Sequence, residues 1–167
     1  MSETKTFSPE LLSRRGEATA WSLAVVATAG LYFLSLRQPV PYWAWFFVAF
    51  LVFSAASISL GNWVDRRTFI HLESGGVAFE NGLRRTHLVW NEIKEVRTAP
   101  ARWGISVQVI GVQSHFSFST LGEMQFQGQV RGQTGFTDGK LILDEIIHSS
   151  GLTKMTQTGQ FLTYSRP

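Results

Sequence analysis

The chain has 167 residues, of which 16% are charged, and its formal net charge at pH 7 is +3. This length leaves room for one domain and an appendage. The sequence contains no cysteine, which excludes disulfides and thiolate chemistry.

Two uncharged stretches dominate the first third of the chain. Residues 18–36 form the first and residues 42–63 the second, and each has about the 20 residues that a helix needs to cross a bilayer. Only "RQPVP" separates them, and its prolines Pro39 and Pro41 cannot continue either helix, so we expect an antiparallel hairpin. Two other interpretations are disfavoured. A pair of helices in a soluble core would not need two uncharged runs of this length, and a signal peptide has a shorter apolar region, of about 7 to 15 residues, followed by a small-x-small site. We therefore interpret both stretches as membrane spans.

Basic residues predict how the two spans are oriented. Arg14 and Arg15 precede the first span, Arg66 and Arg67 follow the second, and Arg37 alone lies between them. Because positive residues favour the cytoplasmic side, we expect both termini in the cytoplasm, with residues 1–17 as a cytoplasmic N-terminal segment. Neither span holds Asp, Glu, Lys, Arg or His, the residue types that mark ion paths, so the hairpin is interpreted as an anchor.

The stretch 75–96, "GGVAFENGLRRTHLVWNEIKEV", alternates as a β-hairpin does. Asn81-Gly82 favours a two-residue turn, which pairs Glu80 with Leu83 and Phe79 with Arg84. In this register Arg84 lies on the core-side face near the tip, whereas Arg85 points outward.

Further segments repeat the period of two. They are "TFIHLE", "IKEVRT", "WGISVQVIG" with Trp103, Ile105, Val107 and Val109 on one side, "SHFSFS" and "EMQFQGQV". About seven strands at this spacing predict a small antiparallel sandwich or barrel. The period then changes, and Ile142, Leu143, Ile146 and Ile147 fall on one helical stripe that should end before Gly151. The expected fold is α+β, with a domain over 64–152 and residues 153–167 as a tail without clear period.

Seven strands followed by one helix resemble the pleckstrin-homology (PH) superfold. The motifs that carry the resemblance are a Gly-hydrophobic strand, Asn81-Gly82, Arg84-Arg85 and a "W-x-x-I-x-x-V" corner over residues 90–96, which are similar to bacterial PH-like domains beside membrane spans. The resemblance implies that Trp90 and Ile93 fill the core at this corner. In its order of parts the chain also resembles photosystem I assembly factors, which have a two-span hairpin before their domain.

No residue pattern predicts catalysis. The four histidines are scattered, and neither a phosphate-binding loop nor a nucleophile elbow is present, so we expect no enzyme, no metal and no cofactor. The phosphoinositide-binding PH domains carry basic residues at the first hairpin loop, but here that loop is "HLESGGV", with Glu73 and no base. From Val64 onward the chain has eleven basic and nine acidic residues, a surplus too small to predict nucleic-acid binding.

A domain tethered to a membrane gains effective concentration for neighbouring membrane proteins. The sequence therefore predicts a membrane-anchored PH-like scaffold that contacts or helps assemble a membrane protein complex, photosynthetic complexes included, in a bacterial plasma membrane or a thylakoid. The alternative is a module that binds the bilayer through anionic lipid headgroups. The candidate contact residues for a partner or lipid are Arg66, Arg67, Arg84, Arg85, Arg97 and Arg102.

Overall fold

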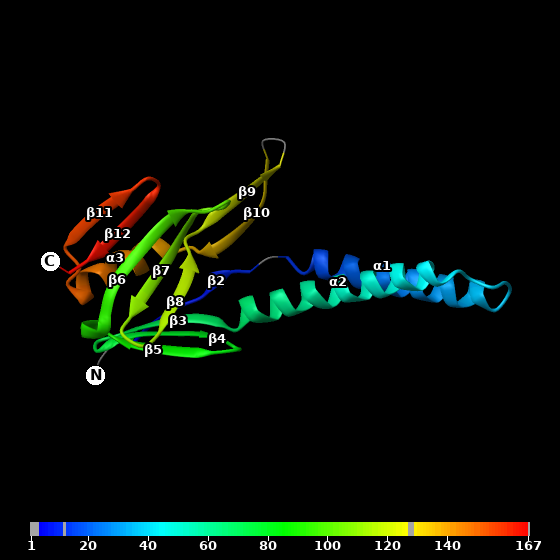
Figure 1. Cartoon of the computed structure of the whole chain (residues 1–167), viewed down its shortest axis with the longest axis horizontal. Helices are drawn as coiled ribbons and strands as arrows, with labels where there is room; N and C mark the ends of the chain where they lie inside the picture. The colour runs from blue at the N-terminus through cyan, green and yellow to red at the C-terminus, as the bar shows by residue number, and fades with distance from the viewer. Residues whose placement is uncertain (1–3, 12, 127–128, 167) are drawn as a thin grey trace. The chain divides into compact units, whose positions relative to one another are not determined.

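The computed structural model describes residues 4–11, 13–126 and 129–166. The chain forms two compact units: one covers residues 13–63, and the other combines the residues before it with those from Val64 onward. The fold is mixed α+β, with three α-helices among the described residues and antiparallel sheets (Figure 1). This agrees with the predicted class.

The helical unit consists of two apolar helices, α1 (Arg15–Ser35) and α2 (Tyr42–Arg66). Both are long and apolar enough to cross a membrane. Ala24 and Ala55 are almost fully buried, at 1% and 0% exposure, whereas large side chains such as Phe46, at 76%, are mostly exposed. The helices therefore touch through small residues and leave a broad apolar surface uncovered.

A chain of hydrogen bonds joins one end of α1 to the opposite end of α2. The Trp21 indole nitrogen donates to Ser59 Oγ at 2.8 Å, and Ser59 Oγ donates to Glu17 Oε1 at 2.8 Å. Asn62 Nδ2 donates to the other carboxylate oxygen of Glu17 at 2.9 Å. Because the start of α1 thus lies beside the end of α2, the two helices are antiparallel, as the short proline-containing connection predicts.

The second unit, called the β unit below, contains three sheets and one helix. The sheets have the strand orders β1-β3-β4-β5, β11-β12-β6-β7-β8 and β2-β10-β9, and every pairing of these strands is antiparallel. The strands are β1 (Lys5–Phe7), β2 (Pro9–Glu10), β3 (Thr68–Glu73), β4 (Gly76–Asn81), β5 (Arg85–Val89), β6 (Ile93–Pro100), β7 (Ile105–Gly111), β8 (His115–Ser119), β9 (Gly122–Phe126), β10 (Gln129–Phe136), β11 (Lys154–Thr158) and β12 (Phe161–Ser165).

One hydrophobic core lies between the first two sheets and helix α3 (Gly139–Ser150). Alternate residues of β3 to β8 point into it, among them Val107, Val109 and Phe116, each at 0% exposure. From α3 it receives Ile142 and Ile146, with Leu143 and Ile147 packed beside them. The helical stripe is therefore as predicted, and the helix ends at Gly151 in the left-handed conformation, at φ 68°.

The β4–β5 hairpin differs in register from the prediction. Glu80 pairs with Arg85 and Phe79 with Thr86, so the predicted partners Leu83 and Arg84 are wrong. Asn81 stays in the strand because its side-chain oxygen accepts hydrogen bonds from the backbone N–H groups of Leu83 and Arg84, which closes the turn. Since the shift is two residues, the strands keep their alternation between core and surface, and Thr86 and Leu88 are buried.

The short helix η1 (Trp90–Glu92) turns the chain from one sheet to the next. Ile93 is fully buried, whereas Trp90 is only partly buried against the core, and its indole nitrogen donates to the Ser74 carbonyl oxygen at 3.1 Å. Ile93 therefore fills the corner as the resemblance implies, and Trp90 covers it from the side.

Strands form at both ends of the chain, where none were expected. Within the predicted N-terminal segment, β1 pairs with β3 and β2 pairs with β10. Within the predicted tail, β11 and β12 form a hairpin, and β12 pairs with β6 (Figure 1). The stretch predicted as one strand, "EMQFQGQV", contains the end of β9 and the start of β10, which pair with each other. Seven predicted strands become twelve in the described part of the chain.

Candidate functional site

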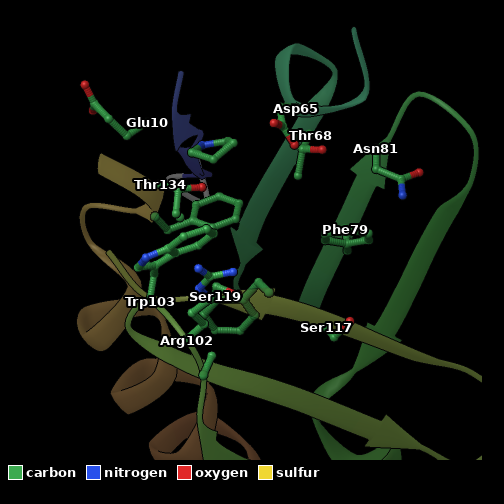
Figure 2. A pocket seen from close by; sticks show the side chains of 15 residues that line it. Glu10, Asp65, Thr68, Phe79, Asn81, Arg102, Trp103, Ser117, Ser119 and Thr134 are labelled. Atoms are coloured by element: carbon green, nitrogen blue, oxygen red, sulfur yellow. The ribbon is translucent and has the colours of Figure 1, made fainter. Parts of the chain in front are cut away.

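The β unit has a hollow of about 430 Å³, which lies between strand β4 and the strands β8 and β10 (Figure 2). Ligand sites in proteins typically have volumes of about 300 to 1,000 Å³. The lining residues come from six parts of the unit, and they are Pro9, Glu10, Asp65, Thr68, Phe79, Asn81, Ala101, Arg102, Trp103, Ser117, Phe118, Ser119, Thr134, Gly135 and Phe136. The hollow therefore depends on the N-terminal strand β2 as well as on the sheets after Val64.

The floor of the hollow is aromatic and rigid. Phe79, Phe118 and Phe136 are buried to 5% exposure or less. They belong to a continuous stack in which Phe116 lies 5.2 Å from Phe79 and 6.3 Å from Phe118, and Phe118 meets Phe136 edge to face at 5.8 Å. Such contacts hold each ring in place through its neighbours. The floor can therefore receive an apolar group without rearranging.

Close backbone contacts between residues 104–105 and Thr120 fix the part of the hollow's wall that carries Trp103. The N–H of Ile105 donates to Thr120 Oγ1 at 3.0 Å, and the N–H of Thr120 donates to the Ile105 carbonyl at 2.9 Å. Gly104 has φ 74°, and a Cβ atom there would lie 2.6 Å from the Thr120 carbonyl oxygen. Only glycine fits this position without strain. The turn at Gly104 takes Trp103 out of the strand alternation and toward the hollow.

The rim is charged on both sides. Glu10 and Asp65 come from different elements and lie apart at the top of the view in Figure 2, with Trp103 and Arg102 below them. Within the described residues neither carboxylate has a hydrogen bond or an ion pair. The Arg102 guanidinium lies 4.8 Å from the centre of the Trp103 ring, a cation–π contact. The arrangement offers two carboxylates above an aromatic floor.

Hydroxyl and amide groups complete the rim. Figure 2 shows Thr68 and Asn81 on one side of the hollow, Ser117 below Phe79 on that same side, and Ser119 and Thr134 on the other side. A few polar groups around an apolar floor are typical of sites that orient a bound group. This composition suits a side chain that is apolar along its length and polar at its end.

The structure does not bring the six predicted arginines together. Arg102 lines the hollow, whereas Arg97 lines a groove on the outer face of the β6–β7 sheet beside Glu95, with which it forms an ion pair. Arg66 ends α2 and Arg67 follows it, and both have partners in the structure.

The Arg84-Arg85 pair forms contacts within the unit. Arg84 is exposed in the turn, so its predicted place on the core face is wrong, and its Nη2 donates to the His115 carbonyl oxygen at 2.8 Å. Arg85 points to solvent 3.9 Å from the Glu80 carboxylate. An exposed pair of this kind contributes little stability. Arg84 thus links the hairpin tip to β8.

Two histidines of the β unit lie next to polar side chains. The His71 ring nitrogen Nδ1 lies 2.9 Å from Thr6 Oγ1, and His87 lies 3.8 Å from the Glu73 carboxylate. Among the residues that the structure describes, no group of three or more His, Asp or Glu side chains is placed to hold a metal ion.

Sequence reasoning missed most of the hollow. The predicted strand included Trp103 on the same side as Ile105, although the glycine that follows Trp103 was a signal for a break in the strand. Asp65, which stands between the second apolar stretch and Arg66, was not among the predicted site residues. Glu10 carried no local signal, because its place depends on the pairing of β2 with β10.

No family model, no curated protein and no solved structure matches this chain.

Proposed function

We propose that the chain is a membrane-anchored scaffold whose PH-like unit binds a partner membrane protein and helps to assemble a membrane complex. Two features support the anchor: the length and apolar character of α1 and α2, and the exposure of their large side chains. The order of strands followed by α3 supports the PH-like interpretation. In this proposal both helices cross the bilayer and both ends of the chain lie in the cytoplasm.

The hollow is the observation that carries the binding function. Asp65 and Thr68 line it, and both lie within a few residues of the end of the apolar stretch of α2. The chain connection therefore keeps the hollow close to the membrane surface once α2 is inserted. A partner that reaches it at this depth is a segment just outside a membrane span.

Charge favours a basic segment as the bound group. Glu10 and Asp65 are free of partners within the described residues, whereas Arg102 is already stacked on Trp103. Cytoplasmic segments next to membrane spans are enriched in Lys and Arg, which combine an apolar stem with a cationic head. The stem would lie on Phe118 and Phe136, and the head would meet the rim carboxylates.

Anionic lipid headgroups fit this hollow less well. Two carboxylates on its rim repel a phosphate, and the one arginine that lines it is engaged by an aromatic ring. Lipid binding through Arg66 and Arg67 at the surface is the outcome that would replace our proposal.

Affinity purification of the full chain in mild detergent tests the proposal. The double variant Glu10→Gln/Asp65→Asn removes both rim charges with little change in shape. Its matched control, Glu92→Gln/Asp144→Asn, makes the same chemical changes at exposed positions away from the hollow. We expect stoichiometric membrane proteins with the wild type and the control, and their loss by at least about tenfold with the rim variant, as for two charge-assisted contacts.

Two results would contradict the proposal. In the first, the rim variant retains its partners as well as the control does. In the second, the pure chain recovers no partner but binds vesicles that contain anionic lipid, and loses this binding when Arg66 and Arg67 are replaced by Gln.

A further inference from the structure

Among the strands that the structure describes, β11 forms an open edge of the largest sheet. It is the last strand in the order β11-β12-β6-β7-β8, and all five of its residues are exposed. Its pairing with β12 has no register shift, so no bulge twists the edge away. The strand "KMTQT" contains no proline and has one charge, at Lys154. It therefore lacks most of the features by which proteins protect a sheet edge.

The hairpin geometry identifies which backbone groups face outward. Thr158 pairs with Phe161 across a two-residue turn, Gly159-Gln160. The pair that closes such a turn is hydrogen-bonded, and hydrogen-bonded and non-hydrogen-bonded pairs then alternate along the strands. Thr158, Thr156 and Lys154 thus direct their N–H and C=O groups to β12. Met155 and Gln157 direct theirs to the free edge.

A row of apolar side chains that crosses the sheet also ends at this edge. The register aligns Met155 with Tyr164, Val96, Val109 and Phe116 across the five strands. The last three residues of this row are fully buried, whereas Met155 is 61% exposed. A strand added at the edge would cover Met155 and continue the row.

We infer that the occupant of this edge is β11 of a second copy, paired antiparallel about Thr156. This register sets Met155 opposite Gln157 of the second copy, and these are the two residues whose backbone groups face outward, so four hydrogen bonds form. It also sets each Lys154 opposite an uncharged Thr158, at opposite ends of the pair. Met155 of one copy lies diagonal to Met155 of the other, within side-chain reach. The strand is thus complementary to itself in hydrogen bonding, charge and apolar cover.

The absence of cysteine from the sequence makes a direct test possible. Two Thr156 residues form a non-hydrogen-bonded pair with Cα atoms about 4.5 Å apart, which is within disulfide range. Two Thr158 residues would be separated by four residues along the strands, roughly 13 Å, and could not be bridged. We therefore compare Thr156→Cys with its matched control Thr158→Cys, each in the full chain in proteoliposomes under mild oxidation.

We expect Thr156→Cys to form a disulfide-linked dimer on the order of 100-fold faster than Thr158→Cys, because pairing raises the effective thiol concentration. Adding Met155→Pro should abolish this difference, since it removes one outward N–H while proline is tolerated at a strand edge. Equal rates for the two cysteine variants, or a Thr156→Cys dimer that Met155→Pro does not affect, would overturn the inference. The readout does not involve the hollow, so it is independent of the proposed partner binding.

Discussion

An alanine that replaces a glycine can destabilise the β unit in two ways: through a positive φ, or through a clash of its Cβ with neighbouring atoms. Four glycines allow these two effects to be measured separately. Gly104 has φ 74°, and its Cβ would lie 2.6 Å from the Thr120 carbonyl oxygen. Gly159 has φ 62° but open space, whereas Gly139 has ordinary φ and would place a Cβ 2.7 Å from Thr120 Cα. Gly75 has neither problem. Alanine substitution at the four positions therefore tests both costs together, each cost alone, and neither.

The expected free-energy losses follow from these geometries. A left-handed alanine costs about 1 to 2 kcal/mol, and forcing an atom into packed backbone costs about 1 to 3 kcal/mol. We thus expect losses of about 1 kcal/mol for Gly159→Ala, about 1 to 3 for Gly139→Ala and about 2 to 5 for Gly104→Ala. Gly75→Ala should be neutral or stabilise by up to about 0.5 kcal/mol, because alanine lowers the entropy of the unfolded chain.

Thermal unfolding of the full chain in mild detergent, followed by near-ultraviolet circular dichroism, measures the series. At about 4 °C per kcal/mol for a unit of this size, Gly104→Ala should lower Tm by roughly 8 to 20 °C and Gly159→Ala by roughly 4 °C. If Gly104→Ala proved no more destabilising than Gly159→Ala, the backbone contacts at Thr120 would not be as tight as described, and the explanation for the position of Trp103 would fail.

Three further substitutions test contacts within the β unit. Phe116→Ala should cost about 3 to 5 kcal/mol in chemical denaturation, because the ring is fully buried in the aromatic stack; a loss below about 1 kcal/mol would refute that role. Arg84→Met should cost only about 0.5 to 1 kcal/mol, since it removes an exposed hydrogen bond to the His115 carbonyl; a larger loss would mean that more depends on this link. Tyr164→Ala should cost about 1 to 2 kcal/mol in the same assay, because the ring packs partly buried against the core, and an unchanged midpoint would indicate a tail with no structural role.

Local periodicity predicted the parts of the fold that bury one face. Strands such as β7 and β8 alternate between core and surface, and α3 carries its apolar stripe at helical spacing. The buried face of each element can therefore be predicted from its sequence. The two apolar helices were found by length alone. The hairpin register was wrong by two residues because Asn81 closes a longer turn: its backbone N–H donates to the Arg84 carbonyl oxygen, and its side-chain oxygen accepts from the N–H groups of Leu83 and Arg84.

Pairing between distant segments could not be predicted in this way. Strand β11 is exposed on both faces and therefore has no alternation to detect. The short strands β1 and β2 form only because β3 and β10 present open edges to them. Glu10 reaches the hollow by that route, so one of the two rim carboxylates depends on contacts that no local pattern records.

Cysteine accessibility tests the central proposal, the membrane anchor with both ends in the cytoplasm, most directly. In the cysteine-free chain, Gln38→Cys marks the connection between α1 and α2, Ser8→Cys the N-terminal side and Gln113→Cys the β unit. With a membrane-impermeant maleimide on intact cells, we predict labelling of Gln38→Cys alone, and labelling of the other two only after permeabilisation. Labelling of Gln38→Cys and Gln113→Cys from the same side of the membrane would contradict the account.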